Sequence, residues 1–288
     1  MKTLKYYLKK AQEKKFTIGH YNFSDFTQLK AIVSAGEKNK SPIILGTSEG
    51  ESKFFGLEEA VALRNVLRKK SGLPIFLNLD HGKSFEYVKE AIDAGYDMVH
   101  FDGSKMPLDE NIKITKQVVK YARRRGVLVE GEVGKIGNEA SRLYSEKFII
   151  NENDLTKPDD AARYIKETKV DLLAVSIGNF HGIEISGIDP NLRLDILKAI
   201  KERVGKTFLS LHGGSGTPED DIKDAIRLGI CKININTEIR LAFSGNLRKF
   251  LNSNMEEIAP YKFLATAKMA AEGAVDRKIK LFGSANKI

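Results

Sequence analysis

The sequence contains one cysteine, Cys231, and a single cysteine cannot form a disulfide within the chain. That scarcity is compatible with a reducing compartment. No stretch approaches the roughly 20 consecutive apolar residues that a membrane-spanning helix needs. Residues 1–16 carry charges throughout and lack the apolar core of a signal peptide. We therefore expect no disulfide framework, no membrane span and no secretion signal, and we expect a cytoplasmic location.

The chain also lacks low-complexity segments and linkers rich in proline, glycine or serine. Its 288 residues are enough for one large domain or two small ones. Hydrophobic residues make up 42% of the chain and apolar runs recur along its whole length, which excludes a disordered protein. Because no boundary is visible, we expect a single domain over residues 1–288.

Negative charge is in short supply. The chain has 47 lysines and arginines but only 38 acidic residues, which gives a formal net charge of +9. Such a surplus occurs in proteins that bind nucleic acids, membrane surfaces or anionic substrates. The one strong basic run, Arg123–Arg125, is interpreted as a solvated helix end, where cations are favourable. Aromatic and basic residues do not interleave, so we expect neither nucleic acid nor membrane as a partner.

Two patterns alternate along the chain. Short, β-branched apolar runs are separated by stretches whose apolar residues recur at helical spacing, such as 85–92. Several of these stretches end at a glycine, which suits the left-handed residue after a helix: Gly72, Gly95, Gly126, Gly205 and Gly229. The apolar runs predict eight strands, at Phe16–Ile18, Pro42–Leu45, Ile75–Leu79, Met98–Phe101, Val127–Val129, Asp171–Ile177, Thr207–Leu211 and Cys231–Ile235.

Eight strands that alternate with helices over about 250 residues predict an α/β fold, the (β/α)8 TIM barrel. A doubly wound open sheet is the alternative. The count of eight, and the absence of a G-x-G-x-x-G motif after the first strand, favour the barrel. Residues 133–157 are polar and irregular, so we expect a mobile active-site loop there. A C-terminal helix and tail are expected over residues 260–288.

Histidines stand at the ends of the predicted strands, where the chemistry of this fold is located. Three of the five histidines, His81, His181 and His212, follow separate strands and precede a glycine. Three convergent imidazoles form a good zinc site with a position left open for substrate. The other two, His20 and His100, lie earlier in their strands and are interpreted as packing residues; a role beside the metal stays open for His20.

A glycine-rich turn, Gly213–Gly216, follows the seventh strand and precedes a helix with an early proline. Backbone N–H groups in such a turn favour a phosphate, and TIM barrels often hold phosphate near the seventh and eighth strands. Alternation in the eighth strand places Lys232, Asn234 and Asn236 on one face, with the two asparagines beside that turn. The alternatives are a plain turn and a polar layer inside the barrel.

Three carboxylates also stand at strand ends. Asp80 directly precedes His81, so it lies beside the predicted metal and suits proton transfer to a substrate oxygen. Asp102 and Glu132 follow the fourth and fifth strands, where they could orient the histidines or form a second metal position. A structural ion pair is the alternative for either residue.

Five segments occur in a fixed order along the chain: LDHGKSFE (79–86), IDAGYDMVHFDGS (92–104), SIGNFHG (176–182), LHGGSGTP (211–218) and KININTEIR (232–240). Together they resemble the class II, zinc-dependent ketose-bisphosphate aldolases, which include fructose-bisphosphate and tagatose-bisphosphate aldolases. The resemblance extends from about Phe16 to Gly283. No single segment is specific, but their order is.

The resemblance implies a role for each matching residue. Asp80 matches the proton donor and acceptor for the aldehyde oxygen, and Glu139 is the nearest match to the base that forms the enediolate. The zinc ligands match His81, His181 and His212. We add Asn22 and Ser48, which end the first two strands, to the substrate-binding set. The residues that match the binding site of dihydroxyacetone phosphate are Gly182, Gly213, Gly214, Ser215, Asn234, Ile235, Asn236 and Thr237.

The implied reaction is the reversible cleavage of a ketose 1,6-bisphosphate, foremost fructose 1,6-bisphosphate, into dihydroxyacetone phosphate and glyceraldehyde 3-phosphate. It proceeds through a zinc-stabilised enediolate and belongs to glycolysis. Zn²⁺ is the implied cofactor, with Co²⁺ or Fe²⁺ as alternatives, and a monovalent cation (Na⁺ or K⁺) near the phosphate is usual in the family. The implied partners are small sugar phosphates and, in a homodimer or homotetramer, copies of the same chain in contact through the helix at 261–282.

The sequence departs from the family pattern in three places. After the second matching ligand, residues 183–190 replace the family's Y-K-G-x-P. The loop after the fifth strand lacks the family's G-G-x-E-D, and Glu139 comes one residue early. Tyr261 stands where the family has the arginine that binds the distal phosphate, and Lys262 or Lys268 could substitute as a point charge. The part of the site that binds dihydroxyacetone phosphate, the donor half, is expected to be intact. Tagatose 1,6-bisphosphate, or a product of dihydroxyacetone phosphate with a different aldehyde, is the alternative substrate.

Other function classes remain as alternatives. A non-catalytic barrel could bind metal and sugar phosphate, but Asp80 would then have no task. Metal-dependent hydrolase barrels commonly begin with an H-x-H pair on the first strand, which this chain lacks. A Schiff-base aldolase needs a buried lysine on a mid-barrel strand, and the predicted sixth strand offers none.

Overall fold

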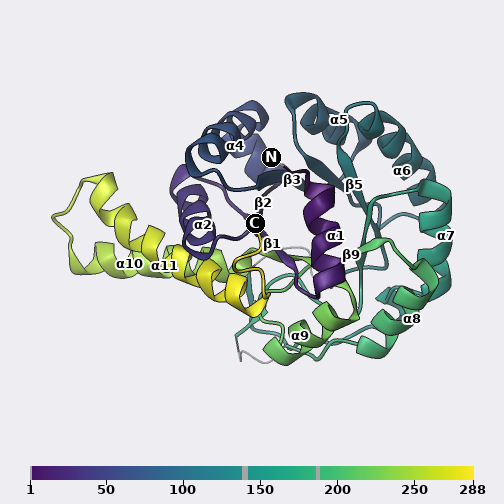
Figure 1. Cartoon of the computed structure of the whole chain (residues 1–288). Coiled ribbons are helices and arrows are strands. Elements are labelled where there is room, and N and C mark those ends of the chain that lie inside the picture. The colour runs from purple at the N-terminus through teal and green to yellow at the C-terminus, as the bar shows by residue number, and fades with distance from the viewer. Residues whose placement is uncertain (1, 138–141, 186–188) are drawn as a thin grey trace.

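The computed structural model describes residues 2–137, 142–185 and 189–288. Eight parallel strands close into a barrel in the order β1-β10-β9-β7-β5-β4-β3-β2 (Figure 1). Because this order is closed, the predicted TIM barrel is confirmed and the open doubly wound sheet is wrong. The barrel strands are β1 (Ile18–Asn22), β2 (Ile43–Ser48), β3 (Ile75–Gly82), β4 (Met98–Phe101), β5 (Leu128–Val133), β7 (Leu172–Val175), β9 (Phe208–Leu211) and β10 (Ile230–Ile235).

All eight predicted strands are present, but β1, β2, β3 and β5 extend further toward their C-terminal ends than the apolar runs indicated. The first run ended at Ile18, whereas β1 continues through His20 to Asn22. These polar residues belong to the strand because their side chains are buried and find polar partners there. Nε2 of His20, for example, lies 3.1 Å from Nδ2 of Asn78 on β3.

Helices cover the outside of the barrel between successive strands (Figure 1). Glycines end several of them in the left-handed conformation, as predicted: φ is 105° at Gly95 and 113° at Gly229. Within the described residues, no helix is long and apolar enough to cross a membrane. The helices are α1 (Leu4–Lys14), α2 (Phe26–Asn39), α3 (Glu49–Phe55), α4 (Leu57–Ser71), α5 (Phe85–Ala94), α6 (Leu108–Arg123), α7 (Pro158–Thr168), α8 (Leu194–Val204), α9 (Glu219–Leu228), α10 (Thr237–Ser253) and α11 (Pro260–Leu281).

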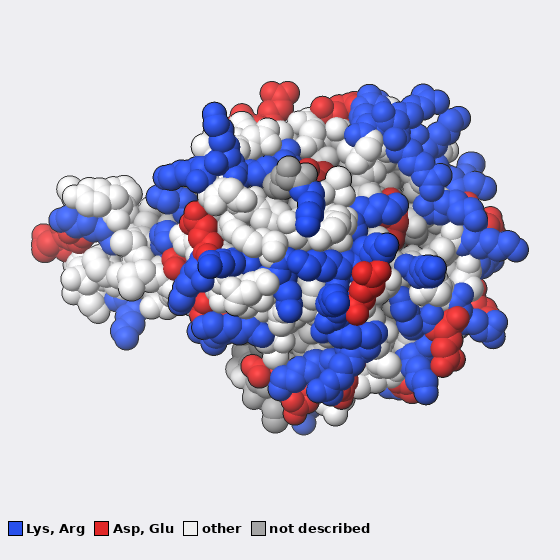
Figure 2. Space-filling view, viewed as in Figure 1, with Lys and Arg blue, Asp and Glu red and all other residues white. Residues whose placement is uncertain are grey.

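Helix α1 lies across the N-terminal end of the barrel (Figure 1). Its Leu4 and Leu8 are buried with Phe76 and Cys231, so apolar contacts close that end. On the same face, Figure 2 shows lysines and arginines spread widely, with acidic residues among them. This distribution agrees with the interpretation of the basic surplus as solvated surface.

The segment after β5 pairs with the loop after β7. The short strand β6 (Leu143–Tyr144) pairs with β8 (Ile183–Glu184), and the segment continues through a 3₁₀ turn at Glu152–Asp154. Phe148 stacks on Phe180 with 4.7 Å between the ring centroids. The two loops therefore form one layer beside the C-terminal end of the barrel. The predicted base, Glu139, lies outside the described residues.

Helices α10 and α11 pack along each other and project from the barrel as an arm (Figure 1). The connection between them carries Met255 and Ile258, which are 85% and 86% exposed. Tyr261, in the first turn of α11, is 76% exposed. The residue at the expected position of the distal-phosphate arginine therefore faces solvent on the arm.

Candidate active site

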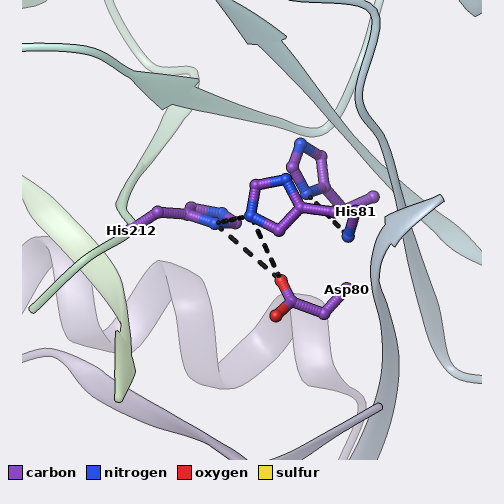
Figure 3. Close-up of side chains that lie close together, drawn as sticks. Asp80, His81 and His212 are labelled. Atoms are coloured by element: carbon purple, nitrogen blue, oxygen red, sulfur yellow. Dashed lines mark hydrogen bonds and ion pairs between the residues drawn. The ribbon is translucent and has the colours of Figure 1, made fainter. Parts of the chain in front are cut away.

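The predicted ligand residues meet at the C-terminal ends of the barrel strands, where this fold places its chemistry. Asp80 and His81 belong to β3, His181 lies after β7, and His212 directly follows β9. Asp80 and His212 are buried. Figure 3 shows the side chains of Asp80, His81 and His212 pointing toward one another.

His81 and His212 face each other through one ring nitrogen each. Nε2 of His81 lies 2.9 Å from Nδ1 of His212. Nδ1 of His81 is 2.8 Å from Oδ2 of Asp102, and Nε2 of His212 is 2.9 Å from Oε1 of Glu130. Because carboxylates accept hydrogen bonds, they hold protons on these outer nitrogens and leave two lone pairs facing each other. A proton or a metal cation between the rings relieves that repulsion.

His181, the third predicted ligand, lies beside this pair, but neither group of described residues with metal-ligand spacing includes it. Its ring centroid lies 4.8 Å from that of His81 and 6.1 Å from that of His212. Its backbone N–H donates to the carbonyl of Gly137 at 2.8 Å, so the loop after β5 helps to hold it. Burial and the neighbouring His81 lower the pKa of His181 to about 3. The ring is therefore neutral near pH 7 and has a lone pair to offer a metal.

His100, which the sequence indicated as a packing residue, belongs to this cluster. It is buried as expected, but its ring centroid lies 4.6 Å from that of His81 and 4.8 Å from that of His212. Its Nδ1 accepts the backbone N–H of His81 at 3.2 Å. The potential ligand atoms of His100, His81, His212 and Asp80 all lie within 4.8 Å of one another. Alternation along β4, which places His100 and Asp102 on one face, could have identified it.

Asp102 and Glu132 flank His81. Asp102 bonds to the His81 ring through Oδ2 and accepts the Ser104 hydroxyl through Oδ1 at 2.6 Å. Oε2 of Glu132 lies 3.8 Å from Nδ1 of His81 and 3.3 Å from Nε2 of His100. Burial, with the neighbouring Asp102, raises the pKa of Glu132 well above its usual range. The contacts favour an orienting role for Asp102, although His81, Asp102 and Glu132 also form a second group with metal-ligand spacing.

Asp80 is held between two asparagines. Asn22 donates to its Oδ2 at 3.0 Å and Asn234 to its Oδ1 at 2.9 Å. Burial acts to raise the pKa of Asp80, but His81 and the other bases around it outweigh burial and hold that pKa well below its usual range. Among the described residues, Oδ1 of Asn22 and Oδ1 of Asn234 have no hydrogen-bond partner although both are buried. These oxygens can accept hydroxyl groups of a bound molecule.

A buried ion pair beneath the histidines was missed by sequence reasoning. Nζ of Lys232 on β10 lies 2.7 Å from Oε2 of Glu130 on β5, and both side chains are fully buried. Glu130 also contacts His212, so Lys232 neutralises the carboxylate that orients that ring. An ammonium group held in this way is not the free amine that a Schiff base needs. The alternation that placed Lys232 on the same face as Asn234 was the available signal.

Most of the predicted phosphate-binding residues line a small cavity of about 20 Å³ beside β7, β9 and β10. The backbone there requires glycine: φ is 101° at Gly182 and 64° at Gly213. A Cβ atom on Gly213 would lie 2.0 Å from the carbonyl oxygen of Phe180. The lining residues are Asn22, Asp80, His181, Gly182, Gly213, Ser215, Asn234, Asn236 and Thr237.

Gly214 and Ile235 do not line this cavity. The N–H of Gly214 donates to the carbonyl of Asn234 at 3.0 Å, and the Ile235 side chain is buried in the apolar core. Only the backbone of Ile235 could therefore contact a ligand. The hydroxyl of Ser215 accepts the N–H of Glu238 at 3.3 Å, which leaves its own proton to donate.

A larger cavity of about 510 Å³ opens on the β2–β5 side of the same cluster. Ser48 lies at its edge and caps α3, since its hydroxyl accepts the N–H of Glu51 at 3.3 Å. Asp80 and His181 line both this cavity and the small one. The two cavities therefore meet at the histidine cluster, and one extended molecule could occupy both.

Comparisons with known proteins agree with this geometry. The model of the family described as fructose-bisphosphate aldolase class-II matches residues 2–287. The fructose-bisphosphate aldolase of Streptococcus pyogenes serotype M1 is 38% identical over 293 residues, which covers 98% of this chain and 97% of that protein. The 6-phospho-5-dehydro-2-deoxy-D-gluconate aldolase of Bacillus subtilis is 38% identical over 288 residues, with 99% and 96% coverage. The crystal structure of the YdjI aldolase from Escherichia coli K12 has a TM-score of 0.84 at 30% identity and covers 100% of this chain and 99% of that chain.

Proposed function

The chain belongs to the class II fructose-bisphosphate aldolase family, and we propose that its substrate is fructose 1,6-bisphosphate. The enzyme would cleave this sugar reversibly into dihydroxyacetone phosphate and glyceraldehyde 3-phosphate. The observation that carries the proposal is the pair of opposed imidazole nitrogens, 2.9 Å apart, beside Asp80. A metal-ligand group, an ionised carboxylate and the small cavity lined by Gly182 and Gly213 then lie together in one site.

We propose that His81, His181 and His212 hold a divalent metal, Zn²⁺ foremost, with Co²⁺ or Fe²⁺ as alternatives. The carboxylates of Asp102 and Glu130 support this assignment because they direct ring nitrogens with lone pairs toward a common centre. When bound there, the metal supplies Lewis-acid polarisation of the ketone of the substrate.

We propose that the small cavity binds the phosphate of dihydroxyacetone phosphate. Gly182, Gly213 and Ser215 offer backbone and hydroxyl donors, and Thr237 begins α10, whose N-terminus favours an anion. Asn234 and Asn236 present amide groups to the same space. A monovalent cation, Na⁺ or K⁺, beside the phosphate completes the proposal. Gly214 and the backbone of Ile235 contribute by shaping this turn.

Asp80 is proposed to move the proton at the bond that breaks. In cleavage, the ionised carboxylate accepts the proton of the C4 hydroxyl while the C3–C4 electron pair stays with the donor half. The aldehyde leaves, and a general acid returns a proton to C3 of the donor half. In synthesis, Asp80 returns its proton to the new C4 oxygen. Glu139 is the residue proposed for the C3 proton.

Two alternatives stay open for the substrate. Tagatose 1,6-bisphosphate differs from the fructose sugar in one stereocentre, and the Bacillus subtilis relative is named for a phosphorylated gluconate derivative. A non-catalytic barrel that binds metal and sugar phosphate is the alternative from another class, and the ionised Asp80 argues against it. We further propose a homodimer or homotetramer that buries the exposed apolar residues of the α10–α11 arm, and a cytoplasmic location.

The test is cleavage of fructose 1,6-bisphosphate and tagatose 1,6-bisphosphate by purified protein, before and after EDTA treatment and with Zn²⁺ added back. We expect cleavage that EDTA removes and zinc restores, with the fructose sugar preferred. Preference for the tagatose sugar would show that tagatose 1,6-bisphosphate, and not the fructose sugar, is the substrate. If the zinc-loaded protein cleaves neither sugar, the proposal of a ketose-bisphosphate substrate fails.

A further inference from the structure

Three lysines stand on consecutive strands at the rim of the larger cavity. Lys83 follows β3, Lys105 follows β4 and Lys135 follows β5, and these strands are neighbours in the barrel. All three line the cavity of about 510 Å³, and all three are exposed. Their ammonium groups therefore border one arc of the barrel opening.

Part of this arc lies across the opening from the small cavity lined by Gly182 and Gly213, which we call the cradle. Cradle residues follow β7, β9 and β10. In the closed order, β9 and β10 lie opposite β3 and β4, whereas β7 adjoins β5. Asp80 and His181 line both cavities and so lie between the two regions. A molecule whose reacting carbons are at Asp80 and whose phosphate fills the cradle would extend its far end toward the lysines.

The electrostatics of the rim favour an anion at this far end. Lys83 and Lys135 make no ion pair with any residue that the structure describes. Of the acidic residues lining the rim, Glu49 is engaged by Lys53 at 3.2 Å and by the backbone N–H of Lys83 at 2.7 Å. Asp154 also lines the cavity, as do the deeper Asp80, Asp102 and Glu132 of the histidine cluster, and these carboxyl groups offset part of the basic field. Arg240 adds a further basic side chain to the lining.

The lysines on the arm do not provide this charge in the isolated chain. Lys262 pairs with Glu257 at 2.7 Å and Lys268 pairs with Glu272 at 2.8 Å, and neither lysine lines the larger cavity. Lys262 and Lys268, which the sequence suggested in place of the family's arginine, thus form ion pairs with neighbouring residues on or beside α11.

We propose that Lys83, Lys105 and Lys135 form the subsite for an anionic group at the far end of the aldehyde. This inference rests on the proposed aldolase function. Lysine ammonium groups act as point charges without the bidentate geometry of arginine. The subsite therefore accepts a terminal phosphate or a terminal carboxylate, and it selects charged aldehydes over neutral ones.

The experiment measures aldol synthesis from dihydroxyacetone phosphate by the zinc-loaded enzyme. Three aldehydes are compared: glyceraldehyde 3-phosphate, 3-oxopropanoate and the neutral glyceraldehyde. The variants are Lys83→Met, Lys105→Met and Lys135→Met. Lys113→Met, on the outer face of α6, removes the same charge far from the cavity and is the matched control.

We expect the ratio of kcat/KM for a charged aldehyde to kcat/KM for the neutral one to fall about tenfold for each rim variant, as for loss of one charge-assisted contact. The ratio for Lys113→Met should equal that of the parent protein. The phosphate and carboxylate arms show which anion the subsite prefers. A ratio that no rim variant lowers would overturn the subsite.

Exchange of the C3 proton of dihydroxyacetone phosphate with solvent separates the two proposals. If the parent protein exchanges this proton but the rim variants keep the parent ratio, the donor half works and only the lysine subsite is wrong. If the zinc-loaded parent protein exchanges no proton, the aldolase proposal fails and the subsite fails with it.

Discussion

Nε2 of His81 lies 2.9 Å from Nδ1 of His212, and each ring is bound through its other nitrogen to a carboxylate. Two acidic residues, the half-buried Asp102 and the buried Glu130, thus orient the two imidazoles. Two lone pairs at this separation are unfavourable without a cation between them. A metal site explains this arrangement, because the cation removes the repulsion between the lone pairs. Simple packing does not explain it, because the repulsion would remain.

The first prediction concerns Glu130, which orients His212. Glu130→Gln removes the negative charge that increases the basicity of the ring, and we expect the affinity for Zn²⁺ to fall about 10- to 100-fold. Competition with a chromophoric chelator measures this affinity without any assay of activity. Glu202→Gln, exposed on α8, is the control and should bind zinc like the parent protein. Unchanged affinity in Glu130→Gln would show that the carboxylate does not support a ligand.

The second prediction concerns the stability of the buried pair of Glu130 and Lys232. Lys232→Met leaves a carboxylate buried without its cation, and we expect a loss of about 3–5 kcal/mol in the free energy of unfolding. The double variant Glu130→Gln with Lys232→Met removes both charges and should recover much of that loss. Urea denaturation of metal-free protein measures both. Strict additivity of the two single effects would contradict the coupling that their 2.7 Å contact implies.

The third prediction is a pH dependence of stability that comes from His20. Burial, with the nearby Lys232, lowers the pKa of His20 to about 3, so the folded protein keeps this ring neutral. The opposite charges of Asp80 and Glu130 oppose the shift, and His100 adds to it. Below its ordinary pKa of about 6.5, the unfolded chain binds a proton that the folded protein refuses. Stability is therefore lost as the pH falls from about 6.5 toward 3.

His20→Gln isolates this contribution. The stability of the parent protein relative to the variant should decrease by roughly 2–3 kcal/mol between about pH 7.5 and pH 4.5. Chemical denaturation at the two pH values gives the difference, and acid effects of the remaining carboxylates cancel between the two proteins. A difference that stays constant with pH would mean that His20 takes up its proton over the same pH range in the folded and unfolded protein.

The fourth prediction separates the role of Asp80 from metal binding. Asp80→Ala removes the carboxylate proposed to move the C4 hydroxyl proton, and we expect sugar cleavage to fall about 10²- to 10⁴-fold. Zinc affinity should change far less, because the histidines remain. Asp80→Asn, which keeps the size and both asparagine neighbours, should lose cleavage to a similar extent. Retained cleavage in either variant would remove Asp80 from the mechanism.

The barrel and the convergence of His81, His181 and His212 could be predicted because both follow from simple periodicity. Short apolar runs mark the strands, and residues directly after parallel strands meet at one end of the sheet. Gly95 and Gly229 were predictable at helix ends for a related reason, because the left-handed conformation excludes most other residues.

His100, Glu130 and Lys232 escaped prediction because they are buried polar residues within strands. In a sequence, a charged residue inside an apolar run indicates the end of a strand or a solvent-facing position. The barrel interior instead pairs such residues with one another, as in the contact of Glu130 with Lys232. Such pairing is a property of neighbouring strands that lie far apart in the sequence. The solvent-facing position of Tyr261 on the arm likewise depends on how α10 and α11 pack.

Exchange of the C3 proton of dihydroxyacetone phosphate with deuterated solvent tests the account most directly, since it needs the metal and the donor half but no aldehyde. We predict exchange with zinc-loaded protein, loss of exchange after the metal is removed by EDTA, and recovery when Zn²⁺ is added back. Exchange that persists at the same rate in fully metal-free protein, or that fails with zinc present, would contradict the metal-dependent aldolase.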